Sequence, residues 1–456
     1  MKSVVSCLAA LIVAATALPL ALTASAQDNV VNITEGTFQP MPTAIPDFSG
    51  DTPEEATLAT DISEVIRNDL AGSGLFRMID PAAFVERNLD ISVLPRFADW
   101  KVISAEALLV GKTTIDTSGQ MSTQFRLFDV FTGRQLYSQE YISSRENWRR
   151  IGHIIADDIY EQLTPDGGYF DSRIVYVAES GPKTKRTRRL AIMDQDGANP
   201  EYLTEGRVEV QTPRFDPSSQ TIIYTALVPD ARNPLIERRR IYLFNIETGR
   251  EEVIGDFGAT SFAARFSPDG ENIAMSIAEN GNSDIYILNT ANRQRTRLTT
   301  NPAIDTSPSY SPDGSQIVFT SDRGGSQQLY IMNADGTDLN CPTGGRDKAC
   351  RITFGQGLYS TPVWSPRGDL VAFTKQTQGR FEIGVIKTDG TGERSLTSDY
   401  LVEGPTWSPN GRVIIFFKES RGGRPGLWSV DLTGRNLKRV PTPGDASDPA
   451  WSPVLQ

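Results

Sequence analysis

One short phrase recurs six times in the second part of the chain: an aromatic residue followed by Ser-Pro or, once, by Asp-Pro. The six prolines are Pro217, Pro268, Pro312, Pro366, Pro409 and Pro453, and they lie 51, 44, 54, 43 and 44 residues apart. A period of roughly 45 residues with one aromatic residue and one turn per unit is typical of four-stranded propeller blades, whereas helical repeats are shorter, at about 33 or 34 residues. The repeat therefore predicts a six-bladed β-propeller.

Each unit also predicts four strands, here called A to D from the innermost outward. The aromatic residue ends strand A, and a Ser-Pro-Asp-Gly turn leads to an apolar strand B, such as 316–320. Strand C follows at 329–333 in the same unit, and an Asp-Gly or Thr-Gly turn then leads to strand D. Glycine supplies the positive φ angle that such tight turns need.

The phase of the repeat predicts how the ring closes. Residues 174–177 have the pattern of a strand B with no strand A before them, and the chain ends on a strand A at 447–452. If these two segments pair, they complete the first blade from both ends of the chain and remove the exposed sheet edges. The propeller is thus expected to span residues 169–456.

The two faces of this propeller differ in sequence. The A–B and C–D turns on one face are short and stereotyped, whereas the B–C and D–A loops on the other vary, as at 258–263, 299–307, 354–361 and 398–404. Variable loops on a rigid scaffold commonly carry recognition. The residues just before each strand A crowd the channel mouth, and the binding candidates there are Phe262, Asp305, Thr306, Tyr359, Ser360 and Glu403. The simpler interpretation is that each caps a strand or fills a loop.

Charge limits the class of partner. The net charge of −11 gives the molecule no overall attraction to nucleic acid or to an anionic membrane surface, so protein partners are expected. Two basic segments, 183–189 and 238–240, are expected in neighbouring B–C loops at the rim of the variable face. A solvated edge is the simpler interpretation, and contact with an acidic protein surface is the alternative. No metal or cofactor is predicted.

The start of the chain has the pattern of a secretory signal. Met1-Lys2 precedes an apolar stretch at 8–22, and Ala24-Ser25-Ala26 offers small residues for cleavage between Ala26 and Gln27. Residues 1–26 are thus expected to be removed and the mature protein to be exported. Beyond this signal the cysteines are Cys341 and Cys350. A local disulfide is predicted in an oxidising space, with two free thiols as the alternative.

Residues 27–168 lack the repeat and predict a small α/β domain. Long amphipathic helices are expected near 54–70 and 147–163, a short helix near 81–87, and strands at 76–79, 105–114, 125–130 and 135–142. The chain enters the propeller at a strand B, so this domain should lie on the A–B turn face, opposite the variable loops. His153, the only histidine, is expected to be structural. Residues 28–35 are expected to be a tether or a detachable strand, followed by a flexible Pro-rich segment at 39–46.

Three phrases carry a resemblance to a known family along nearly the whole mature chain. They are Asp69-Leu70-Ala71-Gly72-Ser73-Gly74-Leu75-Phe76, the helix start 148–152, and the terminal Pro449-Ala450-Trp451-Ser452-Pro453. With the signal and the six blades, they resemble the TolB family, the periplasmic components of the Tol–Pal system. The resemblance implies an N-terminal domain with an anticodon-binding-domain-like fold, and a periplasmic monomer that supports outer-membrane integrity and envelope constriction during cell division.

The resemblance also implies two partners. The propeller of the family binds the peptidoglycan-associated lipoprotein Pal, and its contacts fall here on D–A loops that include Thr260, Ala263 and Thr306. The mature N-terminus is recognised by the inner-membrane protein TolA, and that segment falls here on Gln27, Asp28, Asn29, Val30, Val31, Asn32 and Ile33. The chain departs from the family in having Thr260 where a histidine contact can occur, and in its loop between Cys341 and Cys350.

Two other classes of function compete with this one. Propellers also gate serine peptidases, but those enzymes need a Gly-x-Ser-x-Gly elbow, and this sequence has none. With a single histidine, neither a Ser-His-Asp nor a Cys-His arrangement is readily assembled, so no enzyme is predicted. A periplasmic propeller that binds a small sugar or peptide is the alternative.

Overall fold

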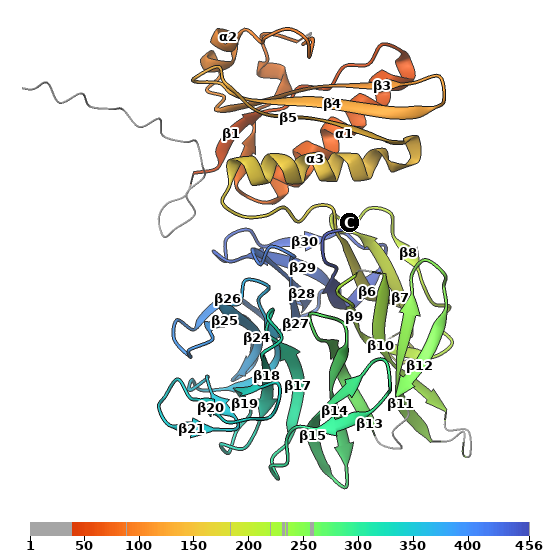
Figure 1. Cartoon of the computed structure of the whole chain (residues 1–456), viewed down its shortest axis with the longest axis vertical. Helices are drawn as coiled ribbons and strands as arrows, with labels where there is room; N and C mark the ends of the chain where they lie inside the picture. Colours follow the sequence, from red (N-terminus) through yellow and green to blue (C-terminus); the bar gives the residue numbers. More distant parts are fainter. Residues whose placement is uncertain are drawn as a thin grey trace, which may run out of the picture.

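The computed structural model describes residues 39–455, apart from 88, 183, 219, 230–232, 234, 235 and 256–259. These residues form an N-terminal α/β domain that rests on one face of a six-bladed β-propeller (Figure 1). The expected signal peptide, with Ala26 and Gln27 at its cleavage site, and the expected TolA-binding segment 27–33 lie outside the described residues. Within the described part of the chain, no helix has the length and apolar character that crossing a membrane requires.

The N-terminal domain is a five-stranded sheet in the order β2-β1-β3-β4-β5. Strand β3 alternates between two cores: Ala107 and Leu109 pack with the two long helices, and Leu108 and Val110 pack with Trp100 on the other face. The elements are β1 (Met41–Ala44), α1 (Pro53–Gly72), β2 (Phe76–Met78), η1 (Pro81–Ala83), α2 (Phe97–Val102), β3 (Ala107–Ile115), β4 (Gln120–Asp129), β5 (Gln135–Ser144), η2 (Arg145–Asn147) and α3 (Trp148–Leu163).

Helix α1 begins with a capping box that also ties it to the sheet. The Thr52 hydroxyl accepts a hydrogen bond from the Glu55 N–H, and the Glu55 carboxylate accepts from the Thr52 N–H at 2.8 Å. The same carboxylate accepts from the N–H of Ile115, at the end of β3, at 2.6 Å. One side chain therefore fixes both the start of α1 and its position on the sheet.

The expectation of a flexible Pro-rich segment at 39–46 was wrong. Met41–Ala44 forms β1, which lies between β2 and β3 and is parallel to both. Proline is rare in central strands because it cannot donate to the ladder. Here Pro42 contributes only its carbonyl, which accepts from the Glu106 N–H at 2.9 Å. The short helix expected near 81–87 is a single 3₁₀ turn, Pro81–Ala83, and α2 was not expected.

The propeller consists of six four-stranded antiparallel sheets, and in five of them the strands follow in chain order. In the first blade β31 pairs with β6, with Trp451 opposite Ile174 and Ala450 opposite Val175, so the last strand closes the ring. The first two blades are β31 (Asp445–Trp451) with β6 (Arg173–Ser180), β7 (Thr187–Asp194) and β8 (Glu201–Tyr202), and then β9 (Glu209–Phe215), β10 (Thr221–Pro229), β11 (Glu237–Asn245) and β12 (Glu251–Gly255). The third and fourth blades are β13 (Thr260–Phe266), β14 (Asn272–Glu279), β15 (Asn282–Asn289) and β16 (Arg295–Arg297), and then β17 (Asp305–Tyr310), β18 (Gln316–Ser321), β19 (Gln328–Asn333) and β22 (Cys350–Arg351). The fifth and sixth blades are β23 (Leu358–Trp364), β24 (Leu370–Thr377), β25 (Arg380–Lys387) and β26 (Arg394–Asp399), and then β27 (Leu401–Trp407), β28 (Val413–Glu419), β29 (Gly426–Asp431) and β30 (Lys438–Val440).

The Ser-Pro-Asp-Gly phrase recurs because its serine, aspartate and glycine each stabilise the A–B turn. In the fourth blade the Ser311 hydroxyl accepts from the Gln316 N–H at 3.0 Å, and the Asp313 carboxylate accepts from the Ser315 N–H at 3.0 Å. Gly314 supplies a φ of 72°, in the left-handed region. The aromatic residue before the turn joins neighbouring blades: Trp407 Nε1 donates to the carbonyl of Val363 at 3.0 Å.

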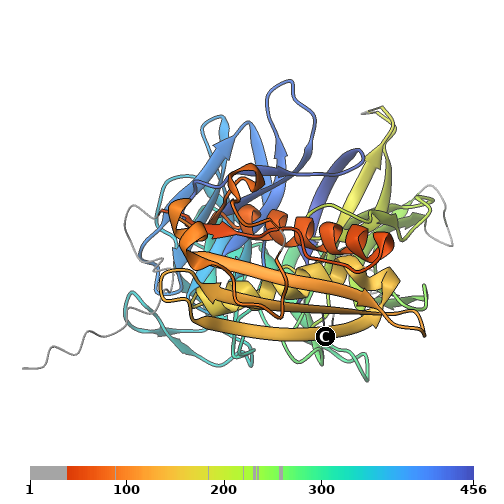
Figure 2. The same ribbon diagram turned by 90° about the horizontal axis from the view of Figure 1, so that it is seen from above.

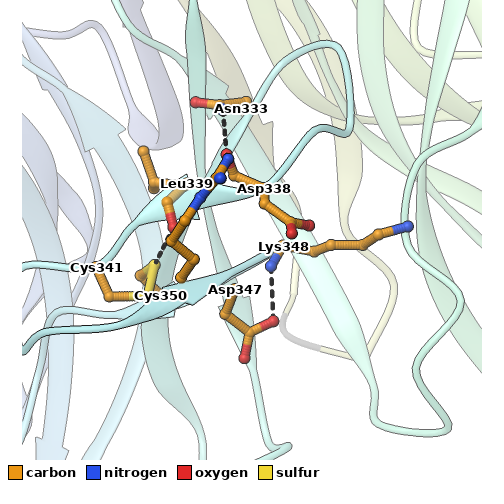
Figure 3. The surroundings of a disulfide bond; sticks show 8 residues. Asn333, Asp338, Leu339, Cys341, Asp347, Lys348 and Cys350 are labelled. Atoms are coloured by element: carbon orange, nitrogen blue, oxygen red, sulfur yellow. Dashed lines mark hydrogen bonds between the residues drawn. A yellow bond between two sulfur atoms is a disulfide. The ribbon is translucent and has the colours of Figure 1, made fainter.

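A hairpin inserted into the fourth blade carries the disulfide. Strands β20 (Leu339–Asn340) and β21 (Arg346–Asp347) pair outside the blade sheet. Cys341 and Cys350 are bonded across the base of this insertion (Figure 3). Asn333, at the end of β19, donates its side-chain N–H to the carbonyl of Asp338 at 3.3 Å and anchors the other side. The insertion accounts for the longest interval of the repeat, 54 residues.

Candidate functional site

The N-terminal domain covers the A–B and C–D turns, so the opposite face of the propeller is left open. Figure 2, seen from above, shows the sheet and helices of this domain lying across the propeller. The Asp166 carboxylate bonds Arg367 at 2.5 Å and Arg412 at 2.6 Å, and both arginines belong to A–B turns. The Gly72 carbonyl accepts from Asn436 and Lys438, at a C–D turn. The B–C and D–A loops therefore form the free surface, here called the variable-loop face.

All six inner strands carry the same irregularity near this face. Each has a β-bulge at which one residue adopts a positive φ between 47° and 64°. The six residues are Thr212, Ala263, Ser307, Thr361, Gly404 and Asp448. Non-glycine residues rarely adopt this conformation, and bulges re-aim the side chains beside them. In five blades a proline follows the bulged residue, two positions before the aromatic residue, so these prolines are a sequence signal from which the bulges could have been predicted.

Four large apolar side chains are exposed on three consecutive D–A loops of the variable-loop face. They are Ile304 at 47%, Phe354 at 58%, Leu358 at 41% and Tyr400 at 53% exposure, here called the apolar loop set. They precede or begin β17, β23 and β27, the inner strands of three consecutive blades. The sequence pattern indicated the loops that hold them, but not these residues. Large apolar residues exposed on one face of a protein are candidates for an interaction surface.

Ion pairs, hydrogen bonds and a cation–π contact hold these loops in place. Asp305, which directly follows Ile304 in the chain, is 0% exposed and pairs with Arg323 at 2.8 Å. The guanidinium of Arg351 lies over the ring of Phe354, 5.0 Å from its centre. The Tyr359 hydroxyl donates to Glu393 at 2.7 Å, and Lys375 bonds the same carboxylate oxygen. The apolar loop set is thus presented on preorganised loops, which lowers the entropic cost of binding.

The sequence-predicted candidates fall into three groups by exposure. Asp305 and Tyr359 are fully buried, so their side chains support the loops and offer no surface to a partner. Phe262, Thr306 and Ser360 are half-buried directly before the bulges, Ala263 is half-buried at a bulge, and Glu403 is exposed. Thr260 begins β13, and its side chain lies outside the described residues. All eight belong to D–A loops or strand starts of the same face.

The expectation of two basic B–C loops was wrong for part of their length. Residues 187–189 lie in β7 and 238–240 lie in β11. Lys183 lies outside the described residues. Arg186 pairs with Asp445 at 2.7 Å, and Arg188 pairs with Glu179 at 3.1 Å. The charges of Arg186 and Arg188 are thus partly neutralised within the first blade. Strand pairing with β6 and β10 extends further than the sequence pattern indicates, and it includes 187–189 and 238–240 in the blades.

His153 lies at the domain interface, in a buried cluster of charged groups. Its Nδ1 is 2.6 Å from the Asp69 carboxylate on α1, and Arg149 bonds both Asp194 and Asp196 at the end of β7. Ligand atoms of His153, Asp194 and Asp196 lie within 4.8 Å of one another, a spacing that suits a metal ion. The guanidinium of Arg149 already supplies the positive charge between the two carboxylates, so the contacts indicate an interdomain ion-pair cluster.

Comparisons with known proteins agree with this architecture. The family profile described as the TolB beta propeller domain matches residues 160–455, and that of the TolB amino-terminal domain matches residues 29–136. The Tol-Pal system protein TolB of Gluconobacter oxydans (strain 621H) is 42% identical over 429 residues, which cover 93% of this chain and 88% of that protein. The crystal structure of TolB from Acinetobacter baumannii superposes with a TM-score of 0.78 at 28% identity, over 91% of this chain and 97% of that one. The chain therefore belongs to the TolB family of Tol–Pal system proteins.

Proposed function

We propose that this protein is a periplasmic, non-enzymatic adaptor of the Tol–Pal system. It binds the peptidoglycan-associated lipoprotein Pal through the variable-loop face and TolA through residues 27–33. By joining the two partners it supports outer-membrane integrity and envelope constriction during cell division. The observation that carries the proposal is the apolar loop set on the open face of the propeller. Membership of the family supports the partners, and the N-terminal segment is proposed from the family resemblance.

The anatomy of the variable-loop face supports a protein partner. Interfaces between proteins place aromatic and aliphatic anchors at the centre and polar groups around them. Phe354 and Tyr400 supply such anchors, and half-buried polar residues such as Thr306 and Ser360 lie on inner strands of the same face. The only histidine is buried against Asp69, away from this face, which supports binding without catalysis.

Replacing Phe354 by aspartate is expected to weaken binding of the Pal periplasmic domain at least tenfold. A charge at the centre of a desolvated contact must be buried without a partner, and truncation of an interface anchor alone costs about 2 kcal/mol or more. Isothermal titration with mature protein, residues 27–456, measures the change. Val102→Asp in α2 is the matched control, because Val102 is also exposed but belongs to the N-terminal domain. Equal affinities for the two variants would count against the proposed face.

Deleting residues 28–33 is expected to abolish capture of the TolA periplasmic domain and to leave Pal binding within twofold of the intact protein. The reason is that the two sites are proposed on different parts of the chain. A pull-down with both partners tests this. The Phe354→Asp variant should show the reverse pattern, with weakened capture of Pal and unchanged capture of TolA. If both variants keep both partners, a small-ligand propeller becomes the better account, and a thermal shift with muropeptides tests it.

A further inference from the structure

The central channel of the propeller holds a cavity at the end nearest the N-terminal domain. Its volume is about 430 Å³, and it is lined by the aromatic residue, its predecessor and the Ser-Pro or Asp-Pro turn of the blades. The A–B turns form this end, as Pro217, Pro366 and Pro409 show by lining it. The cavity therefore lies at the opposite end of the channel from the apolar loop set.

Two arginines from neighbouring blades line this cavity where the other blades have smaller, uncharged side chains. The residues directly before the aromatic residue are Arg214, Arg265, Ser309, Val363, Thr406 and Ala450. Four positions thus leave room near the axis, and two place long cationic side chains at its wall. The same six positions, one in each blade, therefore provide both the volume of the cavity and its positive charge.

No carboxylate of the described residues pairs with Arg265, and the charge of Arg214 is only partly offset by the nearby Asp448. Within the described part of the chain, Arg265 makes no hydrogen bond or ion pair, and Arg214 donates only to the carbonyl of Pro213, at 2.6 Å. The nearby Asp448 carboxylate accepts from the Thr212 N–H at 3.3 Å and forms no ion pair with Arg214. Asp216, at the rim, bonds the Ser218 hydroxyl and N–H. Arg323, which is half-buried like Arg214 and Arg265, has a carboxylate in contact, that of Asp305.

The electrostatic surroundings of Arg214 and Arg265 also favour a bound anion. Burial, and then the charge of Arg214, lower the pKa of Arg265 well below its ordinary value. Burial also lowers the pKa of Arg214, although Asp448 opposes this shift. A guanidinium nevertheless keeps its proton in proteins, so the two positive charges persist and repel each other. An anion between them relieves both the repulsion and the loss of hydration.

We propose that the channel binds a small oxyanion, of the class of phosphate or sulfate, between Arg214 and Arg265. The planar guanidinium offers donors in a fork that matches tetrahedral oxyanions, and charge-assisted hydrogen bonds of this kind are the strong ones. The anion is held at the end of the channel next to the N-terminal domain, so it is compatible with a protein partner on the variable-loop face. The site is independent of the proposed adaptor function.

Isothermal titration and thermal shift with inorganic phosphate and with sulfate, at constant ionic strength set by sodium chloride, test the site on mature protein. Saturable binding is expected for the intact protein, with a dissociation constant at least tenfold weaker in Arg265→Gln and in Arg214→Gln. Arg435→Gln is the matched control, because Arg435 is an exposed arginine at a C–D turn of the same face and does not line the cavity. Phe354→Asp should bind phosphate like the intact protein, which separates this test from that of the adaptor.

Each outcome decides the proposal. Loss of binding in both channel variants, with the control unchanged, supports it. Equal binding by intact protein and Arg265→Gln overturns it, as does a response that sodium chloride alone reproduces, which indicates an adventitious ion only. If Arg265→Gln does not fold, Arg265→Lys and Arg214→Gln decide instead. Lysine keeps the charge but not the fork, so binding that is weakened but retained in Arg265→Lys supports the site, and undiminished binding in Arg214→Gln overturns it.

Discussion

Replacing Asp157 by alanine is expected to lower the free energy of unfolding by about 3–5 kcal/mol. The Asp157 carboxylate accepts hydrogen bonds from the N–H groups of Tyr169 at 2.6 Å, Phe170 at 2.7 Å and Asp171 at 2.9 Å. Alanine leaves three buried N–H groups without a partner, and each such group costs roughly 1–3 kcal/mol. Denaturation by urea, followed by tryptophan fluorescence, measures the change.

The same substitution is expected to loosen the connection between the domains. Tyr169 and Phe170 pack edge-on against Tyr160 of α3, and Tyr169 also contacts Trp451 of the closing strand. Faster proteolysis of the segment 164–172 is the expected readout. The neighbouring Asp158→Ala is the control, because Asp158 accepts a single bond, from Tyr141 at 2.7 Å, and should cost about 1 kcal/mol. Equal losses for the two variants would show that the three N–H contacts contribute little.

The contribution of Asp157 to the stability of the fold should decrease as the pH rises. Burial raises the pKa of Asp157 to about 7, although the three N–H donors oppose the shift. The native state therefore binds a proton more tightly than the unfolded chain, in which the pKa is near 3.8. The stabilisation from this group is complete below about pH 4 and is lost as the pH rises towards 7. The loss caused by Asp157→Ala is expected to be larger at pH 5 than at pH 8.

Replacing Asp69 by alanine is expected to cost about 3–5 kcal/mol, because it removes one partner of a buried ion pair. Asp69 and His153 are 3% exposed each, and Asp69 also accepts from Gln195 of the propeller at 2.7 Å. The change therefore affects both the N-terminal core and the domain interface. Urea denaturation measures the cost, and a double-mutant cycle with His153→Gln isolates the coupling between the two side chains. Strict additivity would show that the pair contributes nothing.

The pH profile of His153→Gln tests the charge of the imidazole. Burial lowers the pKa of His153, but the carboxylates of Asp69, Asp196 and Asp194 outweigh it and raise the pKa above 6.5. A raised native pKa means that the stabilisation is complete below pH 6.5 and is lost as the pH rises through the native value. The difference in unfolding free energy between intact protein and His153→Gln should therefore be constant in mild acid and shrink in alkali. A difference that grows with pH would contradict the assignment.

The propeller could be predicted from the sequence because the contacts that stabilise its turns are local. The turn residues Ser311, Asp313 and Gly314 satisfy contacts within six residues of one another, so their pattern repeats wherever the turn repeats. Helices α1 and α3 were expected within two residues of their observed starts, because their apolar stripes are long and periodic. Strand β1 was missed because four residues that include Pro42 carry no strand signal, and only pairing with β2 and β3 holds them extended.

The sequence by itself determined the fold class, the six blades and the face on which variable loops gather, because turn chemistry and hydrophobic period act over a few residues. Tertiary structure alone decided which residues of those loops are exposed. Asp305 and Tyr359 are buried and bonded to Arg323 and Glu393, whereas Phe354 and Tyr400 are exposed to solvent. It also brought His153 to Asp69 and aligned Arg214 with Arg265 across neighbouring blades. Such pairings depend on contacts between segments far apart in the chain, and burial and charge there follow from packing, which no local pattern encodes.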